Sequence, residues 1–187
     1  YDEARNIVAK FINAKSKEVA FTSGDSMSLN QIAFGMAHLL SEDDEVLISV
    51  VEHASNVLPW YRVSEIKGCK VNFIPLDEEG NITEENLRKV ISNKTKVVSI
   101  AHVTNVLGNV NDVKTLAKVC HDFDAWLVVD GAQSVPNVPT SGGTWLSMTY
   151  SIGDCTASHR LSWQVVGLGR SKSITNGNQW MCIDDIK

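Results

Sequence analysis

The stretch that decides the fold is residues 126–133, which read WLVVDGAQ. Apolar residues 125–129 run directly into Asp130, and an apolar run of this length is typical of a strand covered on both faces. Ligands of parallel α/β sheets bind beyond the carboxyl ends of the strands. The side chains that follow this run, Asp130 and Gln133, are therefore the first candidate site residues.

Apolar runs alternate with helical stripes along the chain that precedes this stretch. The pattern predicts strands at residues 19–22, 46–50, 71–75, 97–102 and 126–130. Between them, apolar residues at helical spacing predict helices at residues 7–12, 29–40, 60–66 and 113–123, and Thr83 is a predicted N-cap of a further one. The alternation predicts an α/β domain with a mainly parallel sheet flanked by helices.

Composition excludes several classes of protein. The chain has 187 residues and a net charge of −5, so it lacks the basic surface of a nucleic-acid or anionic-membrane binder. Its four cysteines form no CxxC pair, which argues against a zinc site or a dense disulfide framework and favours a reducing, cytoplasmic setting. Without a signal segment or a long apolar run, we expect a soluble chain that begins inside a longer protein.

The composition and the hydrophobic periodicity of the sequence change after Pro139. A Trp-, Ser- and Thr-rich stretch with weak periodicity follows, and it supports no secondary-structure prediction. We expect residues 1–139 to form the domain core. Residues 140–187 form an anomalous tail, which a shifted reading frame, a spliced exon or a sequence artefact would explain.

Two further strand ends could hold an anion or an aromatic ring. Gly24, Asp25 and Ser26 lie where a predicted strand leads into a helix, so free N–H groups and a hydroxyl could hold a phosphate there, although an ordinary N-cap is the simpler interpretation. His53 follows the strand that ends near residue 51 and could lie flat against an aromatic ligand. A solvated loop histidine is the alternative.

The remaining two candidates follow later strands. Asn105 offers an amide that could orient a ring substituent, and a turn stabilised by Asn and Gly is its alternative. Asp130 could accept the proton of a pyridinium nitrogen, or it could bind a metal or a nucleotide. Neither of the phosphate-binding glycine loops GxxxxGK[ST] and GxGxxG occurs in the chain, so nucleotide binding is the less favoured interpretation of Asp130.

Three of these segments together resemble cysteine desulfurases and selenocysteine lyases of the class-V aminotransferase fold. Residues 52–60, EHASNVLPW, are similar to the family's Glu-His-His-Ala-Asn-x-x-Pro-Trp segment. Residues 102–108, HVTNVLG, are similar to its Asn-Val-Leu-Gly loop, and residues 129–133, VDGAQ, to its Val-Asp-Gly-Ala-Gln strand end. The resemblance covers roughly residues 1–139.

The resemblance implies the large domain of a fold type I enzyme that binds pyridoxal 5′-phosphate. His53 would stack on the pyridine ring and assist proton transfer, and Asp130 would pair with the ring nitrogen. Asn105 and Gln133 would lie near the ring oxygen, and Ser26 would help to hold the phosphate with Gly24 and Asp25.

The activity implied is removal of sulfur or selenium from L-cysteine or L-selenocysteine, giving alanine, in the service of iron–sulfur cluster assembly. The full-length parent would be a homodimer and could pass sulfur to an acceptor protein. Another class-V enzyme, such as an aminotransferase, an epimerase or a kynureninase, remains an alternative. A non-catalytic fragment or pseudoenzyme is another.

Two departures from the family pattern concern the cofactor. The family has small hydroxyl residues where this chain has Asp25 and Ser26, and a carboxylate beside a phosphate dianion is unfavourable. The family's Schiff-base lysine lies in a Ser-Gly-His-Lys segment that this sequence lacks. The most similar segment is residues 158–160, Ser-His-Arg, in which His159 is a candidate cofactor contact. Arg160 occupies the position of the lysine, and it cannot form the Schiff base because arginine stays protonated.

Overall fold

The computed structural model describes residues 1–12 and 14–134, together with the backbone of residues 159–168 and 178–186. In this part of the chain a sheet runs in the order β2-β1-β3-β4-β6-β5. Its strands are β1 (Glu45–Ser49), β2 (Lys70–Ile74), β3 (Thr95–Ala101), β4 (Trp126–Asp130), β5 (His159–Leu168) and β6 (Asn178–Ile186).

The first four strands of this order run parallel. β1 pairs in parallel with both β2 and β3, and β3 pairs in parallel with β4. β6 is antiparallel to β4 and to β5. The predicted α/β class with a mainly parallel sheet is therefore confirmed, with an antiparallel pair added at one side.

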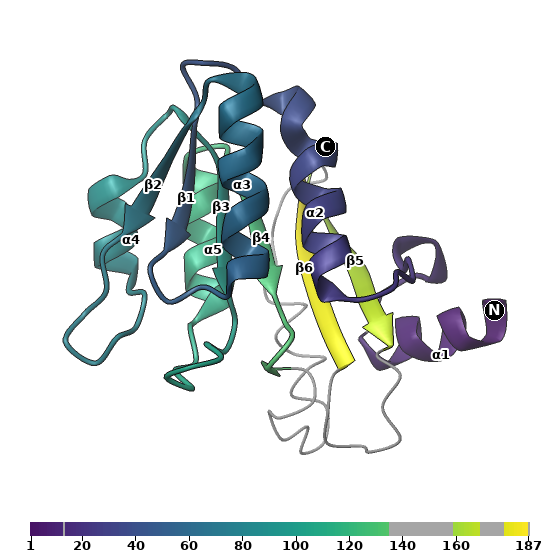
Figure 1. Ribbon diagram of the computed structural model, residues 1–187. Helices are drawn as coiled ribbons and strands as arrows, with labels where there is room; N and C mark the ends of the chain where they lie inside the picture. The colour runs from purple at the N-terminus through teal and green to yellow at the C-terminus, as the bar shows by residue number, and fades with distance from the viewer. Residues whose placement is uncertain (13, 135–158, 169–177, 187) are drawn as a thin grey trace.

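Helices α2 (Asp25–Met36), α3 (Ala54–Lys67), α4 (Glu84–Val90) and α5 (Val113–Asp122) cover both faces of the sheet. The described chain also has α1 (Asp2–Phe11) and the short 3-10 turns η1 (Ser16–Glu18) and η2 (Ala37–Leu39). One hydrophobic core joins α2 and α3 to the sheet, and a second joins α4 and α5 to it. Figure 1 shows α2 and α3 on one side of the sheet and α5 on the other.

Strand β1 belongs to both cores because successive side chains of a strand point to opposite faces. Val46 and Ile48 pack in the core beneath α2 and α3, whereas Leu47 packs in the core beneath α4 and α5. All three side chains are fully buried. This double burial explains why the strand reads as a continuous apolar run instead of alternating with polar residues.

The parallel strands fix where a ligand site can form. β1, β3 and β4 end at the same edge of the sheet, and α2 and α3 begin beside that edge (Figure 1). The backbone N–H of His102 donates to the carbonyl of Asp130 over 2.9 Å, which ties the ends of β3 and β4 together. The helix N-termini and strand ends thus converge on one region.

The predicted strand at residues 19–22 is wrong. These residues form no strand and follow the turn η1. Val19 is buried against Ala9 and Ile12 of the α1 segment, with Phe21 partly buried beside them. The apolar character that suggested a strand comes from this small separate cluster, because it packs a helix and a loop and not a sheet.

The other predicted elements occur, although the helices predicted at 7–12, 29–40 and 60–66 begin four to six residues earlier, as α1, α2 and α3. The strands predicted at 46–50, 71–75 and 97–102 are shifted by one or two residues at their ends, and 126–130 is β4. Thr83 is the N-cap of α4, since its Oγ1 accepts a hydrogen bond from the backbone N–H of Asn86 over 3.1 Å. Within the tail, for which no element was predicted, the backbone forms β5 and β6.

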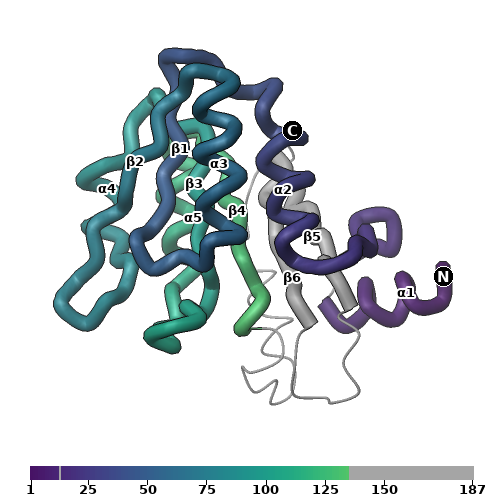
Figure 2. Tube along the Cα trace, in the orientation of Figure 1, coloured from purple at the N-terminus to yellow at the C-terminus, as the bar shows by residue number. Residues whose placement is uncertain are grey.

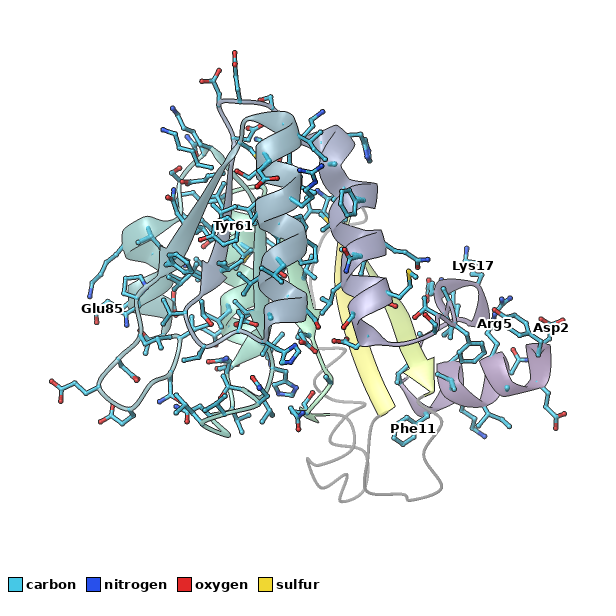
Figure 3. The ribbon with its side chains drawn as sticks, viewed as in Figure 1. Asp2, Arg5, Phe11, Lys17, Tyr61 and Glu85 are labelled. Carbon is cyan, nitrogen blue, oxygen red and sulfur yellow. The ribbon has the colours of Figure 1, made fainter. Side chains whose placement is uncertain are left out.

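Helix α1 stands apart from the two main cores, as the backbone trace in Figure 2 makes plain. The Arg5 guanidinium lies over the ring of Tyr1, 4.5 Å from its centroid, and 3.8 Å from the carboxylate of Asp2. Figure 3 shows Asp2 and Arg5 at the end of the molecule opposite Glu85 of α4. These surface contacts fix α1 locally and do not reach the edge where the strands end.

Replacing Leu47 by alanine should destabilise the protein by about 2–5 kcal/mol, because the change removes buried methyl groups and leaves a cavity in a closed core. Urea unfolding followed by circular dichroism measures the free energy of unfolding. The matched control is Leu58→Ala, whose leucine is 64% exposed on α3. Equal losses in the two variants would contradict the double burial of β1.

Candidate functional site

A cavity of about 150 Å³ lies at the edge where β3 and β4 end. Its lining residues come from the start of α2, the N-cap of α3, the last residues of β3 and β4 and the segments that follow these strands. They are Asp25, His53, Ala101, Val103, Asn105, Asp130, Ala132 and Gln133. Five of the eight candidate residues named from the sequence therefore lie around one cavity.

The buried residues of the cavity are mainly acidic. Asp25 and Asp130 are each 4% exposed, and Ala101 is buried between the strand ends. The Oδ1 atom of Asp130 accepts a hydrogen bond from the backbone N–H of Ala132 over 2.8 Å, which fixes the carboxyl orientation just past the strand. The cavity therefore presents two carboxyl groups to whatever occupies it.

The exposed residues of the cavity are polar and neutral or basic. His53, Asn105 and Gln133 are solvent-exposed and line the same space. Asn105 lies in a loop closed by hydrogen bonds from Thr104 N to Asn109 O and from Gly108 N to Thr104 O. Gly108 has φ +74, a conformation that side-chain-bearing residues rarely adopt, so the loop depends on glycine there.

The imidazole of His53 is oriented by the helix that it caps. His53 is the N-cap of α3, and its Nδ1 accepts a hydrogen bond from the backbone N–H of Ser55 over 3.2 Å. An Nδ1 that accepts places the ring proton of the neutral form on Nε2. Capping thus determines both the tautomer and the direction of the ring at the cavity.

A largely buried polar network around Glu52 and Asn56 holds the start of α3 against the sheet. Glu52 accepts hydrogen bonds from Ser49 Oγ over 2.6 Å and from Asn56 Nδ2 over 2.8 Å. Asn56 in turn accepts from Ser99 Oγ over 2.6 Å. The network links β1, α3 and β3 on either side of His53, so the position of the imidazole depends on it.

Burial dominates the electrostatics of these acids. Burial, reinforced by the charge of Asp130, raises the pKa of Asp25 to about 7. The pKa of Asp130 is also raised by burial, against the Ala132 hydrogen bond and the charge of His53, which lower it. Burial raises the pKa of Glu52 to about 7 despite its hydrogen bonds. Perturbed carboxyl groups gathered at one cavity are typical of functional sites.

Gly24 and Ser26 do not line this cavity. Ser26 lies on a neighbouring hollow between α2 and α3, where its Oγ is 2.7 Å from the Oγ of Ser55. Gly24 is the N-cap of α2 and lies beside that first turn. Ser26 is therefore connected to His53 through Ser55 and not through the cavity itself.

Two residues named from the sequence have side chains outside the described part of the chain. They are His159, whose backbone begins β5, and Arg160. The sequence also gave no reason to single out Ser55 or Ala132, whose contributions depend on backbone hydrogen bonds. A serine two residues after a histidine at a helix start is the one signal that points to Ser55.

The described residues offer neither a metal site nor a membrane span. Among these residues, no group of three or more His, Cys, Asp or Glu side chains could hold a metal ion. Within the same part of the chain, no helix has the length and apolar character needed to cross a membrane. Cys69 and Cys120 are buried in the two main cores.

Comparison with known proteins identifies relatives of most of the chain. The sequence model of the family described as "Aminotransferase class-V" matches residues 1–142. The probable cysteine desulfurase of Halalkalibacterium halodurans is 43% identical over 141 residues, which cover 74% of this chain and 34% of the relative. That of Pyrococcus abyssi is 44% identical over 135 residues, covering 72% of this chain and 33% of the relative. The chain thus spans about a third of the length of these curated relatives.

Solved structures show the same fold. The apo cysteine desulfurase of Thermococcus onnurineus NA1 superposes with a TM-score of 0.75 at 32% identity, covering 97% of this chain and 42% of that one. The cysteine desulfurase CsdA of Escherichia coli superposes with a TM-score of 0.78 over 100% of this chain and 43% of its own. At 23% identity this second likeness shows the fold alone.

Replacing Glu52 by glutamine should destabilise the protein by about 1–3 kcal/mol at pH 5. The NH2 group of glutamine takes the place of one carboxyl oxygen and cannot accept a hydrogen bond, so Ser49 Oγ or Asn56 Nδ2 loses its acceptor. The loss should shrink toward pH 8. In the unmodified protein, the pKa of Glu52 is about 7 in the folded state and 4.5 in the unfolded chain. Between these two pH values the folded state holds a proton that the unfolded chain has released, so the stability contributed by Glu52 falls as pH rises from about 4.5 to about 7. Glutamine does not titrate.

Denaturant unfolding at several pH values measures this difference in stability. Glu78→Gln is the matched control, because Glu78 is exposed. A gap between the Glu52 variant and the parent that stays constant from pH 5 to pH 8 would contradict the raised pKa of Glu52.

Proposed function

This chain belongs to the class-V aminotransferase family, and from that premise we propose that it is part of a cysteine desulfurase that uses pyridoxal 5′-phosphate. The parent protein would remove sulfur from L-cysteine, or selenium from L-selenocysteine, and release alanine. A homodimeric parent, a sulfur-acceptor protein, a role in iron–sulfur cluster assembly and a cytoplasmic location are parts of the same proposal. So is a boundary near residue 139 between the cofactor-binding core and the tail.

The observation that carries the proposal is the buried carboxyl group of Asp130 at a cavity. The imidazole of His53, which caps α3, lines the same cavity. A protonated ring nitrogen needs an ionic partner that water does not screen, and Asp130, at 4% exposed, has that property. Asn105 and Gln133 offer amides to a ring oxygen at the same cavity. These residues fit the ring of pyridoxal phosphate.

Within this proposal each residue has a distinct task. When bound, the cofactor acts as an electron sink for the substrate. Asp130 would hold a proton at the ring nitrogen, and His53, whose Nδ1 accepts from Ser55 N, would have Nε2 available for proton transfer beside the ring. Glu52 and Asn56 position the helix that carries His53. Gly24, Ser26 and His159 are proposed cofactor contacts through the resemblance alone.

A second candidate is a non-catalytic chain that binds the cofactor weakly or not at all. The sequence observation that favours it is the missing Ser-Gly-His-Lys segment. Another class-V reaction remains a third possibility, because the ring-binding residues are common to the class. Activity of this chain therefore requires a test separate from cofactor binding.

Asp130→Asn should weaken binding of the cofactor ring by about 1.5–3 kcal/mol, which is roughly 10- to 150-fold in Kd. Asparagine keeps the shape and can still accept from Ala132 N, so the loss reports the charge. Fluorescence titration with pyridoxine 5′-phosphate, which lacks the aldehyde and forms no adducts with surface lysines, measures the affinity. Asp43→Asn, at an exposed carboxylate, is the control. Unchanged affinity in the Asp130 variant would exclude the role.

This chain should release no sulfide from L-cysteine above a cofactor-only control. Its sequence lacks the family's lysine segment, and arginine stays protonated and cannot replace lysine. Sulfide and alanine assays with added pyridoxal phosphate test this. Two results together would contradict this prediction. They are sulfide release and a pyridoxyl group that borohydride reduction fixes on one lysine, such as Lys172.

A further inference from the structure

Asp25 is the lining residue that fits a phosphorylated ligand least well. It is the first residue of α2, a helix of 12 residues, and it is 4% exposed at the cavity. Aligned with the family pattern, it occupies one of the two positions that carry small hydroxyl residues. An ionised carboxyl there would repel a phosphate dianion at short range, where little water remains to screen the repulsion.

The surroundings of Asp25 favour its protonated form. Asp130 of the β4 end and His53 of the α3 start are the ionisable side chains that share its cavity in the described part of the chain. Asp130 is acidic and buried, so it opposes a second negative charge. The partial positive charge of the α2 N-terminus acts in the opposite direction, but burial outweighs it and raises the pKa of Asp25 to about 7.

Elements packed against α2 contribute no other ionisable group that the structure describes at this cavity. α3 supplies His53, while its Arg62 lies at the neighbouring hollow and pairs with Glu65 over 2.6 Å. β5 and β6 also contact α2, and their side chains lie outside the described residues. In the described part of the chain, burial and then the charge of Asp130 therefore raise the pKa of Asp25.

We propose that Asp25 is a specificity-determining residue: the cavity accepts a doubly charged phosphate ester only while the Asp25 carboxyl is protonated, and rejects it once that carboxyl ionises. The proposal rests on the proposed function, because it concerns the ligand of the same cavity. It goes further by naming the residue that selects between phosphorylated and unphosphorylated forms of the ring ligand. A neutral hydroxymethyl group at this position is tolerated in either state of Asp25.

The pH dependence follows from linkage between proton and ligand. Binding a phosphate ester requires Asp25 to hold a proton, so above pH 7 each further pH unit should raise the Kd by about tenfold. Below pH 7 the carboxyl is already protonated and this dependence disappears. The unphosphorylated ring should show no such dependence.

The experiment compares pyridoxine 5′-phosphate with pyridoxine, by fluorescence titration from pH 6 to pH 8.5. The variants are Asp25→Asn, which keeps the shape, and Asp25→Thr, which restores a hydroxyl, with Asp43→Asn as an exposed control. At pH 8 both Asp25 variants should bind the phosphate ester about tenfold more tightly than the parent, and at pH 6 about equally. Circular dichroism confirms that each variant is folded.

Two results would overturn the proposal. One is a Kd for the phosphate ester with the same pH profile in the parent and in both Asp25 variants. The other is an equal loss of pyridoxine binding at high pH, since Asp25 would then act on the ring or the fold and not on the phosphate.

A ligand-free measurement separates this proposal from the proposed function. The ¹³C resonance of the Asp25 carboxyl should titrate with a midpoint close to 7. A midpoint close to its ordinary 3.8 removes the basis of the selection and overturns the proposal whatever binds. Failure of both ring ligands to bind the parent and every variant counts instead against the proposed function.

Discussion

The hydrogen bond from Asn56 to Glu52 is the contact on which the geometry of the site depends. Glu52 follows β1, Asn56 lies in the first turn of α3, and Asn56 also accepts from Ser99 in β3. These bonds fix where α3 begins relative to two parallel strands. Because His53 lies between Glu52 and Asn56 in the chain, these bonds place its backbone at the cavity, and its own hydrogen bond with Ser55 N orients the imidazole.

Acidic groups are concentrated around this contact. Asp25, Glu52 and Asp130 all have raised pKa values, and burial is the largest cause for each of them. Carboxyls that are buried, like Asp25 and Asp130, or partly buried, like Glu52, are costly for a fold, because each would be better solvated in the unfolded chain. A ligand with a cationic ring edge would offset part of this cost at Asp130. No comparable compensation for Asp25 comes from a ligand that carries phosphate.

Under the proposed function, the two acids of the cavity would act in opposite ways on one ligand. Asp130 would attract the protonated end of a pyridine ring, whereas ionised Asp25 would repel a phosphate group. Their mutual repulsion links the two, since the charge of Asp130 helps to keep Asp25 protonated. A ring ligand that neutralises Asp130 would weaken this repulsion, so ring and phosphate recognition are coupled through one pair of carboxyls.

The sequence by itself determined the α/β class, the approximate bounds of β1 to β4 and the strand-end positions of His53, Asn105 and Asp130, because a doubly buried parallel strand must be apolar and ligand-facing residues follow it. It misassigned residues 19–22, since local apolarity does not reveal which surface a segment packs against. Only the tertiary structure decided that Asp25 faces Asp130 while Ser26 lies at a neighbouring hollow. Adjacent residues in the first turn of a helix point in different directions, and burial of an acid depends on elements distant in sequence.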